Sequence, residues 1–208
     1  MIVLAIDTSL SACSAALVRD GDAVAAISEA MERGHAERLA PLVDELICET
    51  GASFADIDRI VVTAGPGSFT GVRVGLSFAR GLALALGKPC VGISTLEALA
   101  GQGPGPRAGA IAGAGEVYFA AYRDAETLVA PGRFAIEAAR GLAPEGVRVC
   151  GPAATLFEGV ASRIDEAPSP DIVELARLGA ARDPTAFPPS PQYLRAPDAK
   201  LPGGKSLP

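Results

Sequence analysis

The sequence predicts an α/β protein with two lobes, and three observations support this prediction. Short apolar runs typical of strands open the chain, and strand-like and helix-like segments then alternate up to residue 100. Such alternation is typical of α/β folds. A segment rich in glycine and proline then interrupts the pattern, as linkers do. We therefore expect a first lobe at 1–100, a linker at 101–107, a second, smaller lobe at 108–195 and a disordered tail at 196–208.

The first lobe is predicted to open with three antiparallel strands. Met1–Asp7 is a short apolar run typical of a buried strand. Two further apolar runs, Cys13–Arg19 and Ala23–Ser28, flank Asp20-Gly21-Asp22. Because Asp-Gly favours the tight turn of a hairpin, we expect these segments to form a meander.

An amphipathic helix is predicted after the meander. Five apolar residues recur at intervals of three and four and would share one helical face: Leu39, Leu42, Val43, Leu46 and Ile47. Gly51 can end this helix. Pro41 lacks the backbone N–H that a helix interior uses, so we expect the regular helix to begin near it.

Strands and helices then alternate. In the first lobe we expect strands at Arg59–Thr63 and Pro89–Ile93 and helices at Thr70–Leu86 and Thr95–Ala100. Ser94 and Glu97 have the spacing of a capping box at the start of the last helix. In the second lobe we expect strands at Ala108–Ile111, Glu116–Arg123 and Val147–Cys150, helices at Ala153–Val160 and Asp171–Arg182, and an extended proline-rich segment at 183–195.

Composition limits the class of function. The chain has 18 basic and 24 acidic residues, three tyrosines and no tryptophan. It therefore lacks the positive surface and the stacking aromatics typical of nucleic-acid binders, although a partner could supply the positive surface. Aromatics make up only 5 % of the chain, so the core is expected to be aliphatic. The four cysteines lack CxxC spacing, which favours reduced, buried thiols.

We expect a soluble protein of the cytoplasm that makes no membrane contact. The apolar N-terminal run has no basic flank and is interrupted by Asp7, unlike a signal peptide. The most apolar region, Val74–Leu86, contains Arg80 and is shorter than the ~18 residues that a membrane span needs.

The glycine-rich stretch TAGPGSFTGVRVG, residues 63–75, matches neither common phosphate-binding template. A Walker loop places lysine directly after its last glycine, but Val72 follows Gly71 here. The dinucleotide fingerprint GxGxxG does not fit either, because GPGSFTG has one residue too many between its second and third glycines.

The helix after this stretch carries small residues at every fourth position: Gly71, Gly75, Ala79, Ala83 and Gly87. Two glycines inside a helix cost about 1 kcal/mol each relative to alanine. Close approach of another backbone would offset that cost. The helix could pack on its own sheet, pair with another subunit or line a ligand site, and the residues alone leave these three explanations open.

Five motifs carry a resemblance to a known family. MIVLAIDTS, TAGPGSFTGVRVG, GISTLEALA, GEVYFAAY and PQYLR, in this order and spacing, resemble the TsaB (YeaZ) family from residue 1 to about residue 195. The resemblance implies the actin-like ATPase (ASKHA) fold, with two ribonuclease-H-like lobes of which the second is reduced. The whole chain is then an α/β protein of that class.

The resemblance also implies a function. TsaB proteins are the non-catalytic partners of TsaD, which transfers a threonylcarbamoyl group to the adenosine beside the tRNA anticodon, and the ATPase TsaE joins them. A member would have no cofactor of its own, with ATP or ADP at the interface with its partners. It would reach tRNA through the complex and form a homodimer when its partners are absent.

In that family the two helices of the first lobe make the contact with TsaD. The resemblance therefore favours an interface at the glycine-rich helix, formed by Gly71, Arg73, Gly75, Ser77, Ala79, Arg80 and Ala83. On this hypothesis Gly75→Leu or Ala79→Leu leaves the monomer folded and abolishes pairing.

The residues that TsaD-type proteins use for chemistry are not in the matching place. Those proteins hold a metal with HxxxH, whose two histidines share one helix face. Thr95 and Leu99 stand at the matching positions, and His35 is the only histidine in the chain. We expect no metal site and no catalysis, with His35 as a polar residue at a helix start.

A nucleotide cleft is a second possible site. Asp7, Thr8 and Ser9 follow the first strand, and in the ASKHA fold this turn faces the nucleotide; alternatively, the two hydroxyls bond the backbone of the turn. The glycine-rich segment 109–115 of the second lobe has no carboxylate. Ile111-Ala112-Gly113 replaces the Asp-Ala-Arg of many relatives. A stand-alone ASKHA phosphotransferase or ATPase is therefore disfavoured, and a metallopeptidase more so.

Overall fold

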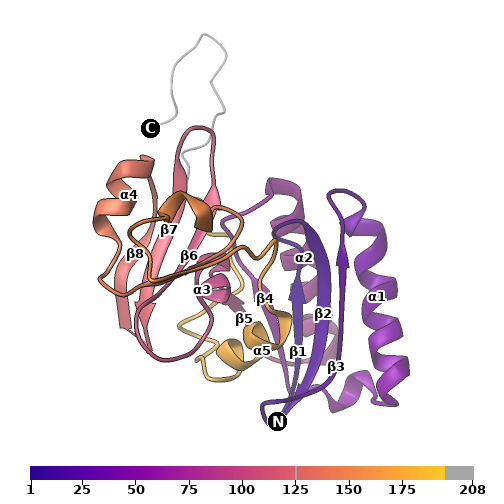
Figure 1. Ribbon diagram of the computed structural model, residues 1–208. Helices are drawn as coiled ribbons and strands as arrows, with labels where there is room; N and C mark the ends of the chain where they lie inside the picture. The colour runs from indigo at the N-terminus through magenta and orange to yellow at the C-terminus, as the bar shows by residue number, and fades with distance from the viewer. Residues whose placement is uncertain (125, 195–208) are drawn as a thin grey trace.

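The computed structural model describes residues 1–124 and 126–194. Two five-stranded mixed sheets lie side by side, with helices between them and on their outer faces (Figure 1). The first sheet has the order β3-β2-β1-β4-β5 and the second has the order β10-β9-β6-β7-β8. The tail at 196–208 lies outside the described residues.

The first sheet contains the predicted meander. Its strands are β1 (Ile2–Asp7), β2 (Ala12–Arg19), β3 (Asp22–Ala30), β4 (Arg59–Thr63) and β5 (Cys90–Ile93). The first three pair antiparallel, whereas β4 and β5 run parallel to β1. Asp20 and Gly21 join β2 to β3 with φ of 54° and 93°, as the tight turn requires.

Helix α1 (His35–Thr50) corrects one prediction, because it begins six residues before Pro41. Pro41 costs the helix the hydrogen bond to the carbonyl of Glu37. Both residues lie on the exposed side of the helix, where water can satisfy that carbonyl. The opposite face is buried on the sheet, and its packing holds the helix in place.

Two further helices belong to the first half of the chain, α2 (Phe69–Leu86) and α3 (Thr95–Ala100). The capping box predicted for α3 is wrong. The Ser94 hydroxyl donates to the carbonyl of Gly65 at 3.4 Å, and the Glu97 carboxylate pairs with Arg182. Tertiary contacts therefore outcompete the local cap.

The second sheet repeats the topology of the first. Its strands are β6 (Arg107–Ala112), β7 (Val117–Arg123), β8 (Glu126–Phe134), β9 (Arg148–Cys150) and β10 (Arg163–Asp165). Again three strands form an antiparallel meander and two run parallel to its first strand. This duplication confirms the actin-like α/β fold with two ribonuclease-H-like lobes.

Several elements of the second lobe differ from the prediction. Helix α4 (Ile136–Leu142) and the strands β8 and β10 were not predicted. Pro131 and Gly132 lie within β8 and are unusual in strands, so the sequence pattern did not indicate a strand there, and β10 is too short, at three residues, to give a pattern. The helix expected at Ala153–Val160 is one 3₁₀ turn, η2 (Ala154–Phe157). The helix expected at Asp171–Arg182 is α5 (Ile172–Ala180).

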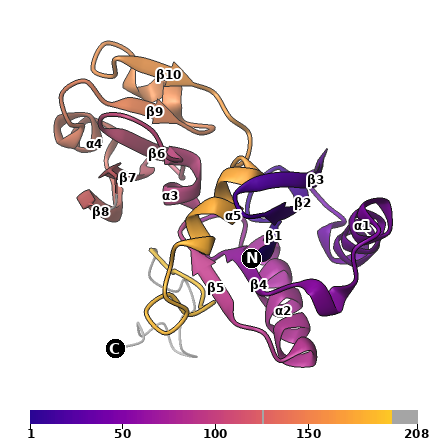
Figure 2. The ribbon, with the colours of Figure 1, turned by 90° about the horizontal axis from the view of Figure 1, so that it is seen from below.

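One helix that follows each lobe in the chain packs on the other lobe. Helices α3 and α5 lie between the two sheets, α1 and α2 cover the outer face of the first sheet, and α4 lies outside the second (Figures 1 and 2). Leu96 and Leu99 of α3 pack with Ile111 of the second sheet. Leu175 and Leu178 of α5 pack on the first sheet. The predicted second lobe at 108–195 therefore does not form a separate layer, because α5 belongs to the core of the first.

The two cores differ in composition. The core beneath α1 and α2 is aliphatic, as composition suggested. The core of the second lobe is centred on Phe119 and Phe157, whose stacked rings are 4.8 Å apart. The expectation of an entirely aliphatic core is therefore wrong for the second lobe.

The remaining connections cross between the lobes. The predicted linker is a series of turns at 101–106, and Arg107 already pairs in β6. Residues 183–194 have no regular element and run back along the first sheet, where the Gln192 N–H donates to the carbonyl of Ala64 at 2.8 Å.

Candidate functional site

The turn between β4 and α2, residues 64–68, lies directly against the turn after β1. The backbone N–H of Ser68 donates to the Ser9 carbonyl at 2.7 Å, and the Thr8 hydroxyl donates to the Gly71 carbonyl at 2.8 Å. The Ser68 hydroxyl caps α2 by accepting from the N–H of Gly71 at 3.3 Å. A side chain at Gly67 would overlap the carbonyl of Ser9. Glycine is needed here because the two turns pack backbone against backbone, with no room for a side chain.

The stripe of small residues on α2 faces its own sheet. A Cβ at Gly71 would overlap the Thr8 carbonyl, and one at Gly75 would lie 2.6 Å from the Thr8 hydroxyl oxygen. Ala79 and Ala83 are buried in the same core. The prediction that Gly71, Gly75, Ala79 and Ala83 form a subunit interface is therefore wrong. Because a side chain at Gly75 would meet the Thr8 hydroxyl, we now expect Gly75→Leu to destabilise the monomer.

The opposite face of α2 is exposed, and it carries the other predicted interface residues, Arg73, Ser77 and Arg80. Phe69 and Leu84 lie on this face and are 63 % and 86 % exposed. Alone, α2 has the length and apolar composition of a membrane span, at 18 residues and a mean hydropathy of 1.3. It packs on the sheet by one face, as core helices do.

A groove of about 500 Å³ runs between α1 and α2. Its lining is formed by Ala36, Leu39, Phe69, Thr70, Arg73, Val74, Ser77 and Phe78. We call it the α1–α2 groove. Its floor is apolar, and the hydroxyls and guanidinium on its α2 side can form hydrogen bonds.

Tyr193 extends the rim of this groove. The Arg73 guanidinium lies 3.5 Å from the centre of the Phe69 ring and 5.8 Å from that of Tyr193. It also donates to the Tyr193 hydroxyl from Nη2 at 3.0 Å. Tyr193 is 58 % exposed, and sequence reasoning gave it no role, although it belongs to the PQYLR motif. Helical spacing could not reveal a contact with a residue 120 positions away.

The predicted nucleotide residues, Asp7, Thr8 and Ser9, are completely buried. One carboxylate oxygen of Asp7, Oδ1, accepts from the hydroxyls of Ser9 and Thr63, both at 2.6 Å, and from the Ser9 N–H at 3.0 Å. The other, Oδ2, has no partner among the described residues. Burial raises the pKa of Asp7, although the bonds from Ser9 and Thr63 oppose this. The two hydroxyls do not bond the backbone of their own turn, as the alternative explanation expected: that of Thr8 donates to the Gly71 carbonyl in α2, and that of Ser9 donates to the Asp7 carboxylate.

A cavity of about 350 Å³ lies between the lobes beside these residues. It is lined by Ser9, Leu10, Ser11, Glu32, Gly67, Ser68, Ile111, Ala112 and Tyr118. Ile111 and Ala112 give it an apolar wall where an acid would be needed to hold a nucleotide-bound metal. Glu116 follows in the chain, but its carboxylate pairs with Arg133.

The remaining chemical candidates are dispersed. Thr95 and Leu99 are buried in α3, at the positions where a metal-binding helix would carry histidines. His35 is the first residue of α1 and is buried, and its Nε2 has no partner within the described ranges. Within residues 1–124 and 126–194, no three His, Cys, Asp or Glu side chains gather in a way that could hold a metal ion.

Sequence comparisons add a family context. The profile of a family described as "TsaD: tRNA N6-adenosine threonylcarbamoyltransferase" matches residues 26–150. The "tRNA threonylcarbamoyladenosine biosynthesis protein TsaB" of Escherichia coli is 44 % identical over 130 residues, which cover 59 % of this chain and 55 % of the relative. An uncharacterized protein of Mycobacterium tuberculosis is 37 % identical over 204 residues, covering 95 % and 93 %. The chain spans about half the length of the TsaB relatives that it matches.

Solved structures share the fold. YeaZ of Pseudomonas aeruginosa superposes with a TM-score of 0.69 at 28 % identity, covering 93 % of this chain and 99 % of that one. A Pseudomonas aeruginosa protein described as similar to "peptidase YEAZ" gives a TM-score of 0.79 at 29 % identity over the same shares.

Proposed function

Because the chain belongs to the TsaB (YeaZ) family, we propose that it takes part in forming threonylcarbamoyladenosine in tRNA. It acts as a non-catalytic subunit that pairs with the transferase TsaD, together with the ATPase TsaE. It has no cofactor of its own, and ATP or ADP binds at the interface with these partners. It reaches tRNA through the complex and works in the cytoplasm.

The α1–α2 groove is the observation that carries this proposal. The groove has an apolar floor with Phe69 in its lining, and the exposed face of α2 also carries Leu84, so a second protein can cover this surface. Arg73 sits at its rim between two aromatic rings. Tyrosine and arginine are enriched among residues that dominate binding energy. We therefore assign the contact with TsaD to this groove and to the exposed α2 face, including Arg73, Ser77 and Arg80.

We propose the same surface for self-association. A second copy would present an identical groove, and a twofold dimer brings the same patch together from both subunits. TsaD and a second copy of this chain would then compete for one surface. Homodimers are expected to dissociate as TsaD is added.

The proposal of a non-catalytic role rests on the residues at the two places where a related enzyme would bind a metal or a nucleotide. Thr95 and Leu99 cannot replace a pair of metal-binding histidines. Asp7 has no solvent exposure, burial raises its pKa, and its Oδ1 is already bonded by Ser9 and Thr63 within the fold. These features support a scaffold whose chemistry resides in the partner.

The decisive experiment is reconstitution. The purified chain and TsaD from the same cell, with TsaE, are assayed for threonylcarbamoyl transfer to tRNA, and each protein alone is the control. Activity that requires the mixture supports the proposal. Transfer by TsaD and TsaE without this chain would contradict it.

A stand-alone nucleotide enzyme is the alternative, and the inter-lobe cavity beside Asp7 is the place it would use. The test is hydrolysis of ATP by the purified chain, compared with Asp7→Asn. Turnover that this substitution abolishes would replace the scaffold proposal with the enzymatic one.

A further inference from the structure

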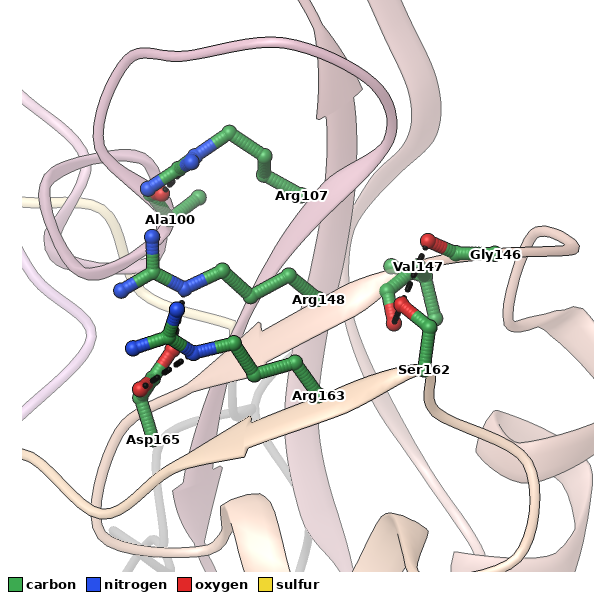
Figure 3. A network of polar contacts seen from close by, with 8 residues as sticks. All are labelled: Ala100, Arg107, Gly146, Val147, Arg148, Ser162, Arg163 and Asp165. Carbon is green, nitrogen blue, oxygen red and sulfur yellow. Dashed lines mark hydrogen bonds and ion pairs between the residues drawn. The ribbon is translucent and has the colours of Figure 1, made fainter.

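Three arginines stand side by side on the second sheet, and the proposed function does not use them. Arg107 in β6 pairs in register with Arg148 in β9, and Arg148 pairs with Arg163 in β10. Paired positions on parallel strands share one face of the sheet and lie about 4.8 Å apart. Figure 3 shows the three side chains extending in the same direction. We call these three residues the arginine row.

The arginine row carries more positive charge than its neighbours neutralise. Asp165 accepts from Nε of Arg148 and, at 3.1 Å, from Nε of Arg163. Arg107 Nε donates instead to the carbonyl of Ala100 at 2.7 Å. Among the described residues, Asp165 is thus the one carboxylate that bonds the row, and it bonds two of its three guanidinium groups.

Glu174 does not neutralise the remaining positive charge of the row. Glu174 of α5 acts on the charge of Arg107 from a distance, but its carboxylate is paired with Arg177 at 2.5 Å. Like charges on paired strand positions destabilise a sheet. In agreement, the pKa of Arg107 is lowered, first by burial and then by the charge of Arg148. A bound anion would relieve this repulsion.

The donors that remain free point to the class of ligand. Each arginine uses Nε for a contact within the fold, and none of their Nη atoms has a hydrogen-bond partner in residues 1–124 and 126–194. The side chains of Arg148 and Arg163 are 34 % and 65 % exposed. Paired Nη groups form a fork that matches the oxygens of phosphates and carboxylates.

Arg107 is held in the row by the turn before it. Gly103, at φ 143°, brings the backbone so close that a Cβ there would lie 2.6 Å from Arg107 Nη1. The bond to Ala100 ties the same guanidinium to the end of α3. The row is therefore built on a sheet and fixed at one end, which limits the entropy lost on binding.

We propose that the arginine row binds the phosphodiester backbone of RNA and so makes a direct contact with the tRNA substrate. This inference rests on the proposed function and extends it, because tRNA is there reached only through the complex. A line of three guanidinium groups suits an extended polyanion, and tRNA is the polyanion that the names of the relatives provide. Such phosphate contacts position RNA without reading its bases.

The overall charge sets the strength of this contact. The chain has a net charge of −6, so the arginine row is a local exception on an acidic protein. Its affinity for RNA is modest in the chain alone and adds to that of the partners in the complex.

The test is the salt dependence of tRNA binding. A fluorescent unmodified tRNA transcript is titrated with the full chain alone and with its mixture with TsaD, from about 50 to about 200 mM KCl. We expect the slope of log K against log salt to become shallower by about 1 for Arg163→Gln and by about 2 for the double variant Arg148→Gln/Arg163→Gln.

Arg123→Gln is the matched control. Arg123 is exposed at the end of β7 and lies on the opposite face of the sheet from the row, so the same loss of charge should leave the slope unchanged. Urea midpoints check that each variant is folded. If the double variant unfolds, Arg163→Gln alone decides, because its side chain is the most exposed of the pair bound to Asp165.

The outcomes separate this inference from the proposed function. Pairing with TsaD and transfer activity that reconstitute normally, while the row variants bind tRNA with wild-type slopes, would overturn the inference alone. If pairing and transfer fail, the titration of the isolated chain still tests the row, and an absent or Arg163-independent slope overturns it. A row that binds polyglutamate but not tRNA would assign it to an acidic protein partner and also overturn the RNA proposal.

Discussion

The two lobes have the same strand order but cover their parallel strands differently. In the first lobe, the 18-residue α2 connects β4 to β5. In the second, the four-residue η2 connects β9 to β10, and each of these strands has three residues. The same strand order is therefore compatible with either a long helix or a single 3₁₀ turn as the connection between the two parallel strands.

The difference is explained by what fills the space above each sheet. Glycines let α2 lie against the backbone at Thr8, so little side-chain volume is needed there. The second lobe has no long helix at this place, and the stacked rings of Phe119 and Phe157 fill the gap. In the first lobe, a helix packs close to the sheet backbone; in the reduced second lobe, two aromatic rings fill the corresponding space.

The difference also decides which lobe can offer a partner surface. In the first lobe, the long helix α2 lies beside α1 and the groove runs between them. On the second lobe, the outer helix α4 has seven residues and exposes Leu142 at 45 %.

The largest effect is expected from Gly71→Leu, which removes the close approach in the first lobe. The new side chain would overlap the Thr8 carbonyl, and we expect destabilisation of about 4 kcal/mol or more, up to loss of folding. Urea unfolding measures it. Gly81→Ala is the control, since a Cβ at that position on the exposed face meets nothing within 4 Å; it should stabilise by about 0.5–1 kcal/mol. Equal effects of the two changes would refute the packing role.

Phe157→Ala is expected to have the next largest effect, in the second lobe. Losing a fully buried ring stacked on Phe119 should cost about 3–5 kcal/mol. Hydrogen exchange should increase first in β6, β7 and β9, while β1 and β4 remain protected. Uniform loss of protection in both sheets would mean that the exchanged helices α3 and α5 join the lobes into one unit.

Leu84→Glu tests the partner surface. A charge on this exposed residue of α2 should weaken pairing with TsaD or a second copy by about 2 kcal/mol, a roughly 30-fold increase in Kd, without loss of stability. Analytical ultracentrifugation measures both equilibria. Leu142→Glu introduces the same change on α4 of the second lobe and should leave pairing intact. Equal weakening by both would show that pairing does not use the α1–α2 side.

Asp7→Asn should have the smallest effect, and that effect should depend on pH. Burial raises the pKa of Asp7, opposed by the bonds from Ser9 and Thr63 and by the charge of His35. The folded state then holds the proton more tightly than the unfolded chain, so its contribution to stability declines as the pH rises above about 4. Asparagine avoids this decline, and we expect it to stabilise by about 1–2 kcal/mol at neutral pH.

Urea unfolding at about pH 4 and about pH 8 measures this difference. The two proteins should have similar stability at the lower pH and diverge at the higher. A wild-type protein that is the more stable at the higher pH would indicate that the Asp7 carboxylate is ionised and paired, which would favour the nucleotide alternative.

The sequence predicted the parts of the fold that depend on local chemistry. Asp20-Gly21 specified the hairpin, and the spacing of Leu39, Leu42 and Leu46 specified the buried face of α1. The capping residues of α3 failed, because Ser94 and Glu97 found distant partners. The prediction that the regular helix begins near Pro41 was wrong, because packing of the buried face of α1 on the sheet stabilises the helix by more than the one hydrogen bond lost at Pro41.

The candidate site was only partly accessible from the sequence. The small-residue stripe was recognised, but its direction was not, because a pattern of glycine and alanine fits a sheet and a partner equally well. Arg73 was a candidate from the start, whereas its partner Tyr193 comes from the other end of the chain. The arginine row has no sequence signal, because its members become neighbours only when β6, β9 and β10 pair.

The sequence by itself determined the strand meander, the main helices, the family and the absence of a second histidine. These follow from short-range periodicity, turn chemistry and residue identity. Only the tertiary structure decided which face of α2 is buried, that α5 returns to the first sheet, and that three arginines share one face of the second. Such choices depend on which surfaces meet once the chain has folded, and residues far apart in sequence make those contacts.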